Sequence, residues 1–293
     1  MYDPNQSLAE GTSLILSLSV EELTLIVGAM HIPAFLGFRP PSPLPVAAAQ
    51  AAERSMRLRR LAVVTDEGKF TVDINLARLL SVCAVPKHML IVQQDFARGE
   101  GYFEKPYEGK PIPRFHFFCA HGFDMVYHNR ATPGMHSFAT LSNPEMVKVT
   151  LAAALQLPNV ANVPDAPDAI YRVDHASLLN AEALFKTGGA DAVYDRMIND
   201  LNAPQSLARA LASRKKHLVG VVWRDDWQEP GYAYDEDTVL NSNGFIVVPA
   251  EEGGLWVYHV EGNNPKMAIF EAVNGVTLID EMVNRLHTQM GIA

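Results

Sequence analysis

The sequence repeats itself at a constant spacing. Residues 76–80 read LARLL and residues 207–211 read LARAL, and positions 76 and 207 are 131 residues apart. Keeping that spacing without a gap, Gly122 aligns with Gly253, and 125–128 (MVYH) aligns with 256–259 (WVYH). A repeat of this length is too long for a solenoid unit. It therefore indicates an ancient duplication with a pseudo-two-fold axis.

Each half shows the same succession of patterns. Ser19 and Glu22 form a capping box ahead of an apolar helix, Asp73 is placed to cap a second helix, and Asn143 with Pro144 begins a third. Short β-rich runs separated by short loops predict antiparallel strands. Strands are expected at 89–94, 114–120, 123–128 and 136–141, and again at 218–224, 245–249, 255–260 and 267–272.

These patterns predict an α+β, internally duplicated pseudo-two-fold fold. Its central antiparallel β-sheet is flanked by helical bundles, and the two strand meanders could join edge to edge to hide an exposed strand edge. The predicted units are an N-terminal half-repeat (1–157), a proline-rich connection (158–168) and a C-terminal half-repeat (169–293). Ser19 and Asp174 match at a spacing of 155, and the excess is assigned to the proline-rich stretch around 39–45.

Composition narrows the class of protein. The chain has 293 residues, of which 48% are hydrophobic and 19% charged, as in folded globular proteins. A formal charge of −9 argues against nucleic acid as a partner. Cys83 and Cys119 lie in apolar runs, which favours buried free thiols in a reducing compartment. With no stretch of eighteen uncharged apolar residues, the expected location is cytoplasmic, without a membrane span.

Histidines provide the best case for catalysis or metal binding. The run 115–121 (FHFFCAH) contains His116, Cys119 and His121, and His128 follows on the next strand. Side chains alternate along a strand, so positions 116 and 121 point to opposite faces. His128 and His259 recur in the repeat, which favours a shared hydrogen-bonding role in the scaffold. We therefore expect no catalytic residues, no metal and no cofactor.

Aromatic residues cluster in two strand-connecting segments. Such side chains are enriched where proteins grip other proteins, although they can also pack onto their own sheet. The predicted partner-binding residues are Tyr102, Phe103, Tyr107, Trp227, Tyr232 and Tyr234.

Several stretches together resemble the EspG family of type VII (ESX) secretion-associated chaperones. They are 18–23 (LSVEEL), 71–80 (TVDINLARLL) followed by 84–86 (AVP), and the closing strand 253–260 with 267–286. The likeness covers most of the chain, in element order more than in individual residues. It implies a cytoplasmic chaperone that keeps helical-hairpin secretion substrates soluble. The acidic, aromatic segment 225–237 and the proline-rich stretch depart from the family pattern.

The prediction is therefore a non-catalytic, EspG-like chaperone or adaptor whose partner is a helical secreted protein. Three alternatives remain open at this point. One is an enzyme, possibly metal-dependent, using His116, Cys119, His121 or His128. Another is a module of the YbjN or type III secretion-chaperone kind. The third is a structural or regulatory module that acts through self-association.

Overall fold

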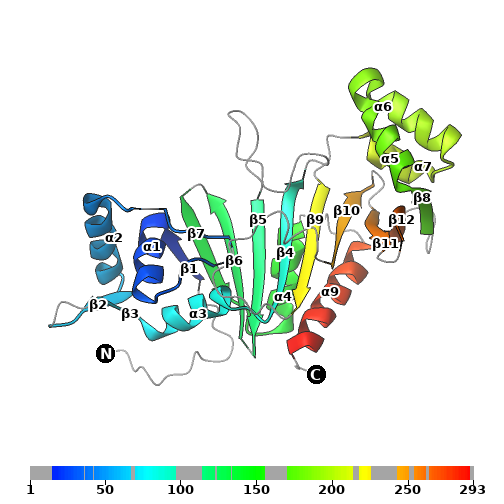
Figure 1. Cartoon of the computed structure of the whole chain (residues 1–293). Helices are drawn as coiled ribbons and strands as arrows, with labels where there is room; N and C mark the ends of the chain where they lie inside the picture. Colours follow the sequence, from blue (N-terminus) through cyan, green and yellow to red (C-terminus); the bar gives the residue numbers. More distant parts are fainter. Residues whose placement is uncertain are drawn as a thin grey trace.

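The computed structural model describes residues 15–35, 37–41, 43–66, 70–96, 114–122, 124–132, 134–155, 170–213, 218–225, 243–250, 254–261 and 264–290. Its elements follow the predicted order (Figure 1). The first half comprises β1 (Ile15–Ser19), α1 (Val20–Ala29), α2 (Val46–Leu58), β2 (Ala62–Val64), β3 (Phe70–Val72), α3 (Ile74–Ala84), β4 (His88–Phe96), β5 (Arg114–His121), β6 (Asp124–Thr132), β7 (Met135–Thr140) and α4 (Pro144–Leu155). The second comprises β8 (Ile170–Asp174), α5 (His175–Ala183), α6 (Phe185–Asp195), the π-helix η1 (Arg196–Asp200), α7 (Gln205–Ala212), β9 (Leu218–Asp225), β10 (Asn243–Pro249), β11 (Leu255–Glu261), β12 (Asn264–Val273) and α9 (Gly275–Met290).

One ten-stranded sheet runs through both halves, in the order β1-β7-β6-β5-β4-β9-β10-β11-β12-β8. Its strands pair antiparallel, and the halves join through β4 and β9, where Leu90 lies opposite Trp223 and Val92 opposite Val221. Counted outward from this seam, the strands of the two halves follow equivalent orders, β4-β5-β6-β7-β1 in the first half and β9-β10-β11-β12-β8 in the second. The predicted α+β, duplicated pseudo-two-fold fold with a central antiparallel sheet is therefore confirmed.

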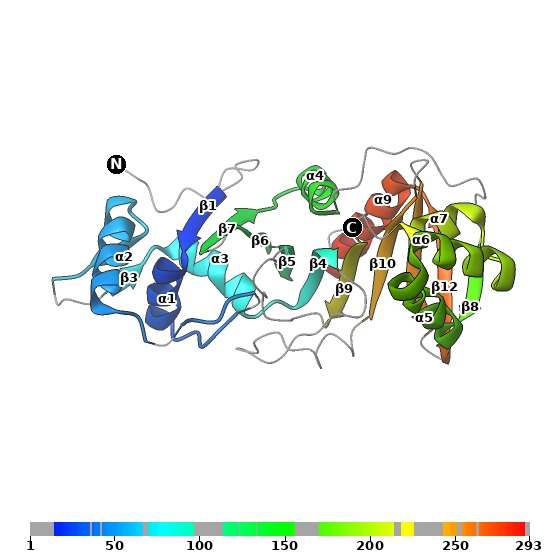
Figure 2. The same ribbon diagram turned by 90° about the horizontal axis from the view of Figure 1, so that it is seen from above.

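The helices form layers on both faces of this sheet. One face carries α1–α3 over the first half and α5–α7 over the second, and α4 and α9 lie together on the opposite face near the middle (Figure 2). Because β4 and β9 are antiparallel neighbours, the pseudo-two-fold axis between them is perpendicular to the sheet. Each face therefore maps onto itself. The core between α4, α9 and the sheet draws residues from both halves.

Helix starts repeat as predicted. Ser19 and Glu22 form a capping box at α1, and Asp174 accepts from the backbone N–H of Ser177 at 2.8 Å at α5. Asn143 at α4 and Asn274 at α9 accept from the backbone N–H three residues on, at 2.9 and 2.7 Å. Each cap satisfies an N–H that has no partner inside its helix.

The excess length of the first half is in two places, not one as predicted. Residues 30–45 separate α1 from α2, whereas Leu184 alone separates α5 from α6. Residues 59–73 separate α2 from α3 and contain the β2–β3 hairpin, whereas 201–204 separate η1 from α7. The sequence prediction missed this hairpin because its strands are three residues each, too short for a periodic signal. Residues 156–169 lie outside the described ranges, so the boundaries of the two halves stay a prediction.

The gapless repeat is wrong for two pairs of strands, β6 with β11 and β7 with β12. In β7, Phe138 lies in the α1–α3 core, whereas its match at the repeat spacing is Ile269, and the β12 residues in the α5–α7 core are Ala268 and Phe270. Tyr127 packs toward the α4 and α9 core, whereas Tyr258 lies in the core formed with α5–α7. Likewise Val126 belongs to the α1–α3 core and Val257 to the α4 and α9 core. A shift of one residue moves every side chain of a strand to the other face. The tyrosines 127 and 258 therefore match in sequence without being structurally equivalent.

Candidate partner-binding site

The six predicted aromatic residues fall in segments 97–113 and 226–242, outside the described residues. The strands that flank these segments lie within the described residues. Phe96, which ends β4, pairs with Leu218, and Asp225, which ends β9, pairs with His88. The two segments therefore join the β4–β9 pair at opposite ends, about 25 Å apart at ~3.3 Å per residue. The attachment points of the two segments are therefore separated by the length of the central strands.

The four residues of the enzyme alternative do not converge. His116 faces the side of α4, where its Nδ1 lies 2.5 Å from Tyr127 Oη. Cys119 and His128 lie on the opposite face, the first against α3 and the second among phenylalanine rings. The Nδ1 of exposed His121 lies 2.8 Å from the backbone oxygen of Val85. Within the described ranges, no group of three or more His, Cys, Asp or Glu side chains could hold a metal ion.

His128 and His259 have different environments. His128 is fully buried, and its Nε2 lies 2.8 Å from Nδ1 of His136, a partner that sequence reasoning missed. His259 is about one-third exposed, with its Nε2 4.0 Å from Glu271. The expected hydrogen-bonding role therefore fits His128, and the repeat does not extend it to His259. The sequence did contain a signal for this pair. His136 and Phe138 are two residues apart on a predicted strand, so their side chains share one face. In the structure this is the face on which His128 lies.

A polar network surrounds Tyr127 on the α4 side of the sheet. Its hydroxyl meets His116 and accepts from Asn129 Nδ2 at 2.8 Å. Burial raises the pKa of Tyr127, and the bond from Asn129 opposes that rise. At neutral pH the phenol is therefore protonated, and its hydroxyl orients His116 and Asn129. This network contributes to the stability of the fold.

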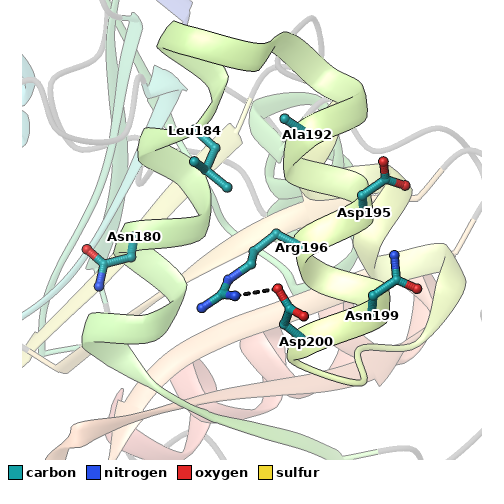
Figure 3. Close-up of a pocket in the computed structure, with 7 residues that line it drawn as sticks. All are labelled: Asn180, Leu184, Ala192, Asp195, Arg196, Asn199 and Asp200. Carbon is teal, nitrogen blue, oxygen red and sulfur yellow. Dashed lines mark hydrogen bonds and ion pairs between the residues drawn. The ribbon is translucent and has the colours of Figure 1, made fainter.

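A hollow of about 510 Å³ lies between α5 and the α6–η1 segment, in the helical bundle of the second half (Figure 3). Leu184 and Arg196 reach into the gap between the helices, where Arg196 forms an ion pair with Asp200. It is open to solvent, and its lining residues are mostly polar in type although apolar atoms make up most of the lining surface. These lining side chains include no histidine, cysteine or hydroxyl nucleophile. Sequence reasoning missed the hollow because residues from separate helices form it. Its lining is Asn180, Leu184, Ala192, Asp195, Arg196, Asn199 and Asp200.

None of the helices in the described part of the chain is long and apolar enough to cross a membrane.

Comparisons with known proteins identify the fold. No family model matches the chain, and no curated protein matches it. Among solved structures, the chain is similar to the type VII secretion system chaperone EspG5 of Mycobacterium tuberculosis, solved in complex with a PE25–PPE41 dimer. The two share 13% identity at a TM-score of 0.60, over 92% of this chain and 95% of that one. At this identity the match shows that the chain has an EspG-like fold.

Proposed function

We propose that this protein is a non-catalytic chaperone or adaptor that binds a helical-hairpin secretion substrate and keeps it soluble. The observation that carries the proposal is the shared fold over nearly the whole length of EspG5, a chaperone solved with its PE25–PPE41 partner. The scattered positions of His116, Cys119, His121 and His128 are consistent with it, because acid–base or metal chemistry needs such groups within contact distance.

The proposed mechanism is physical. An apolar helix tip would otherwise drive its owner to self-associate, and a folded surface that covers the tip removes that apolar area from water. The proposed anchors are the aromatic residues Tyr102, Phe103, Tyr107, Trp227, Tyr232 and Tyr234. Since the two segments join opposite ends of the β4–β9 pair, they would hold an elongated partner at two separate points. The hollow beside Leu184 offers a further contact in the second half.

Co-expression with helical PE–PPE-type heterodimers tests this function. We expect a soluble complex that co-elutes in size-exclusion chromatography, whereas the heterodimer alone aggregates. Two double variants test the anchors: one replaces Tyr102 and Phe103 by alanine, and the other replaces Trp227 and Tyr234 by alanine. Each should weaken binding about 10- to 100-fold, as for buried aromatic anchors. A Leu184→Arg variant tests whether the hollow contributes to partner binding.

Leu58→Ala is the matched control, because it removes an apolar side chain that is 86% exposed on α2, a helix remote from the β4–β9 pair (Figure 1). It should bind as the unaltered protein does. Equal binding by all variants would reject the assigned site, and failure to stabilise any helical heterodimer would reject the function.

A further inference from the structure

Residues 30–45 form a strap between α1 and α2 that the second half lacks. Its centre is a tight turn closed by two backbone hydrogen bonds, Phe35 N–H to Phe38 O at 3.0 Å and Phe38 N–H to Phe35 O at 2.8 Å. Gly37 within it has φ 77°, in the left-handed region that favours glycine. A β-carbon there would lie 2.3 Å from Cε2 of Phe117 on the sheet, so the turn is pressed directly onto β5.

Beneath the turn is a cluster of rings that contains two histidines. Phe35 meets His128 edge-on at 5.6 Å between centroids, and Phe38 meets His136 at 5.1 Å and 83°. On the sheet, His128 stacks on Phe138 at 4.5 Å and on Phe117 at 5.2 Å. Both imidazoles are almost wholly buried, at 0% and 2% exposure. The strap is therefore held down by contacts with these two rings.

The two imidazoles face one another, with His128 Nε2 and His136 Nδ1 2.8 Å apart. One hydrogen between the two nitrogens satisfies this contact while both rings remain neutral. A further proton would create a cation inside an apolar cage, and burying a charge without a counter-charge is costly. The closed strap therefore favours the neutral pair.

No carboxylate among the described residues acts on His136 to offset such a cation. Glu22, the buried carboxylate of α1, is already bonded to Ser19, Ser55 and Arg59. Arg130 of β6 acts on His136 with a charge of the same sign, and the nearby titratable groups of α3 and β5 are the buried thiols of Cys83 and Cys119. Burial first, and Arg130 second, lower the pKa of His136 to about 4.

We propose that the His128–His136 pair is an acid-sensitive latch, and that protonation releases the Phe35–Phe38 turn from the sheet and exposes the aromatic surface beneath. The latch is independent of the proposed chaperone function. Protons bind the open state more tightly because its imidazole is in water. Acid therefore shifts the strap toward the open state, whereas the closed strap is fully favoured above pH 6.5.

The size of the effect follows from the two pKa values of one histidine. With about 4 for the closed state and 6.5 for a solvated imidazole, the closed-to-open ratio falls about 30-fold between pH 8 and pH 5. The limiting fall below pH 4 is roughly 300-fold.

Amide hydrogen exchange, corrected for the intrinsic effect of pH, tests the latch on the intact chain. Protection of the Phe35 and Phe38 amides should fall about 30-fold from pH 8 to pH 5, while Leu90 and Val92 in the central strand keep theirs. Gly37→Ala should lower the protection of Phe35 and Phe38 at pH 8 as well, since its β-carbon cannot fit against Phe117.

His136→Phe keeps a ring but removes one of the two imidazoles, the one whose pKa is lowered to about 4, and should make the loss of protection between pH 8 and pH 5 much smaller than in the unaltered protein. His259→Gln removes one partly exposed histidine outside the cluster and should behave as the unaltered protein does. NMR titration of the unaltered protein needs no variant and should find His136 neutral at pH 5.5. An ordinary pKa for His136, or equal loss of protection in the turn and in β4, would overturn the latch.

Discussion

Glu22 shows how much a single side chain can organise. It is 4% exposed, closes the capping box with Ser19 and accepts from Ser55 Oγ at 2.7 Å. Both of its carboxylate oxygens accept from Arg59 Nη1 at 3.0 Å, and Arg59 Nη2 donates to the backbone oxygen of Ser17 at 2.6 Å. One carboxylate thus joins α1, α2 and the edge strand β1, and Arg59 covers a carbonyl of that edge.

Glu22→Ala is therefore expected to lower the free energy of unfolding by about 3 kcal/mol, because it removes a cap and leaves Arg59 without its counter-charge. Glu22→Gln keeps an acceptor and should cost less. Glu21→Gln, one residue earlier in the same turn, is the control, and chemical denaturation measures all three. A cost for Glu22→Ala no greater than for Glu21→Gln would show that the network contributes nothing.

Cys83 on α3 and Cys119 on β5 are both fully buried free thiols in contact with one another. Burial, followed by the neighbouring Cys119, raises the pKa of Cys83 well above its ordinary value. Because both thiols are buried, they should resist an aromatic disulfide reagent at pH 8 in the native state. In denaturant two thiols per chain should react within minutes. Rapid native labelling would mean that α3 does not cover the sheet as described.

Among the elements, β6 and β11 show where a repeat in sequence departs from a repeat in space. The turn between β5 and β6 is short, with His121 opposite Asp124, whereas Pro249 and Leu255 pair across a longer connection between β10 and β11. The lengths of the connections therefore shift the register of one strand relative to its counterpart. Tyr127 and Tyr258 consequently have different partners, His116 and His175.

This register predicts different responses to the same substitution. Tyr127→Phe should cost about 1–2 kcal/mol and perturb the imidazole NMR signals of His116, because Asn129 and His116 lose a shared partner. Tyr258→Phe should instead perturb His175, whose Nε2 lies 3.2 Å from that hydroxyl. A change at His116 on replacing Tyr258, or none on replacing Tyr127, would contradict the opposite-face assignment.

At the scale of the whole molecule, the two halves share a core. One cluster joins the apolar faces of α4 and α9 to residues of both central strands. These residues are Leu90 and Val92 of β4 and Val221 and Trp223 of β9. Separating the halves would expose this cluster together with the backbone edges of β4 and β9. Exposed strand edges of this kind promote aggregation.

Fragments 1–157 and 169–293 should therefore be insoluble when produced separately and should form a soluble complex when produced together. The intact chain should unfold in a single transition, because the shared core couples both halves. Co-purification of differently tagged fragments and far-UV circular dichroism provide the measurements. Independent, cooperative folding of either fragment would show that the halves are autonomous domains.

Local signals in the sequence were sufficient for most of the fold. Capping residues such as Ser19, Asp73 and Asn143 identified helix starts, because a cap depends on a few adjacent residues. Alternating β-rich runs located the main strands, and the duplication indicated their pseudo-symmetric arrangement. What local patterns could not supply was the register of β11 and β12, the short β2–β3 hairpin and the division of the extra length between two segments.

The candidate site depended far more on tertiary structure. By itself the sequence determined which residue types recur and where aromatic residues concentrate. Only the folded chain showed that His116 and His128 lie on opposite faces, that His136 completes a buried pair with His128, and that α5 and η1 border an open hollow. The physical reason is that capping and strand alternation act over a few residues, whereas a face, a pair or a hollow is set by how distant elements pack.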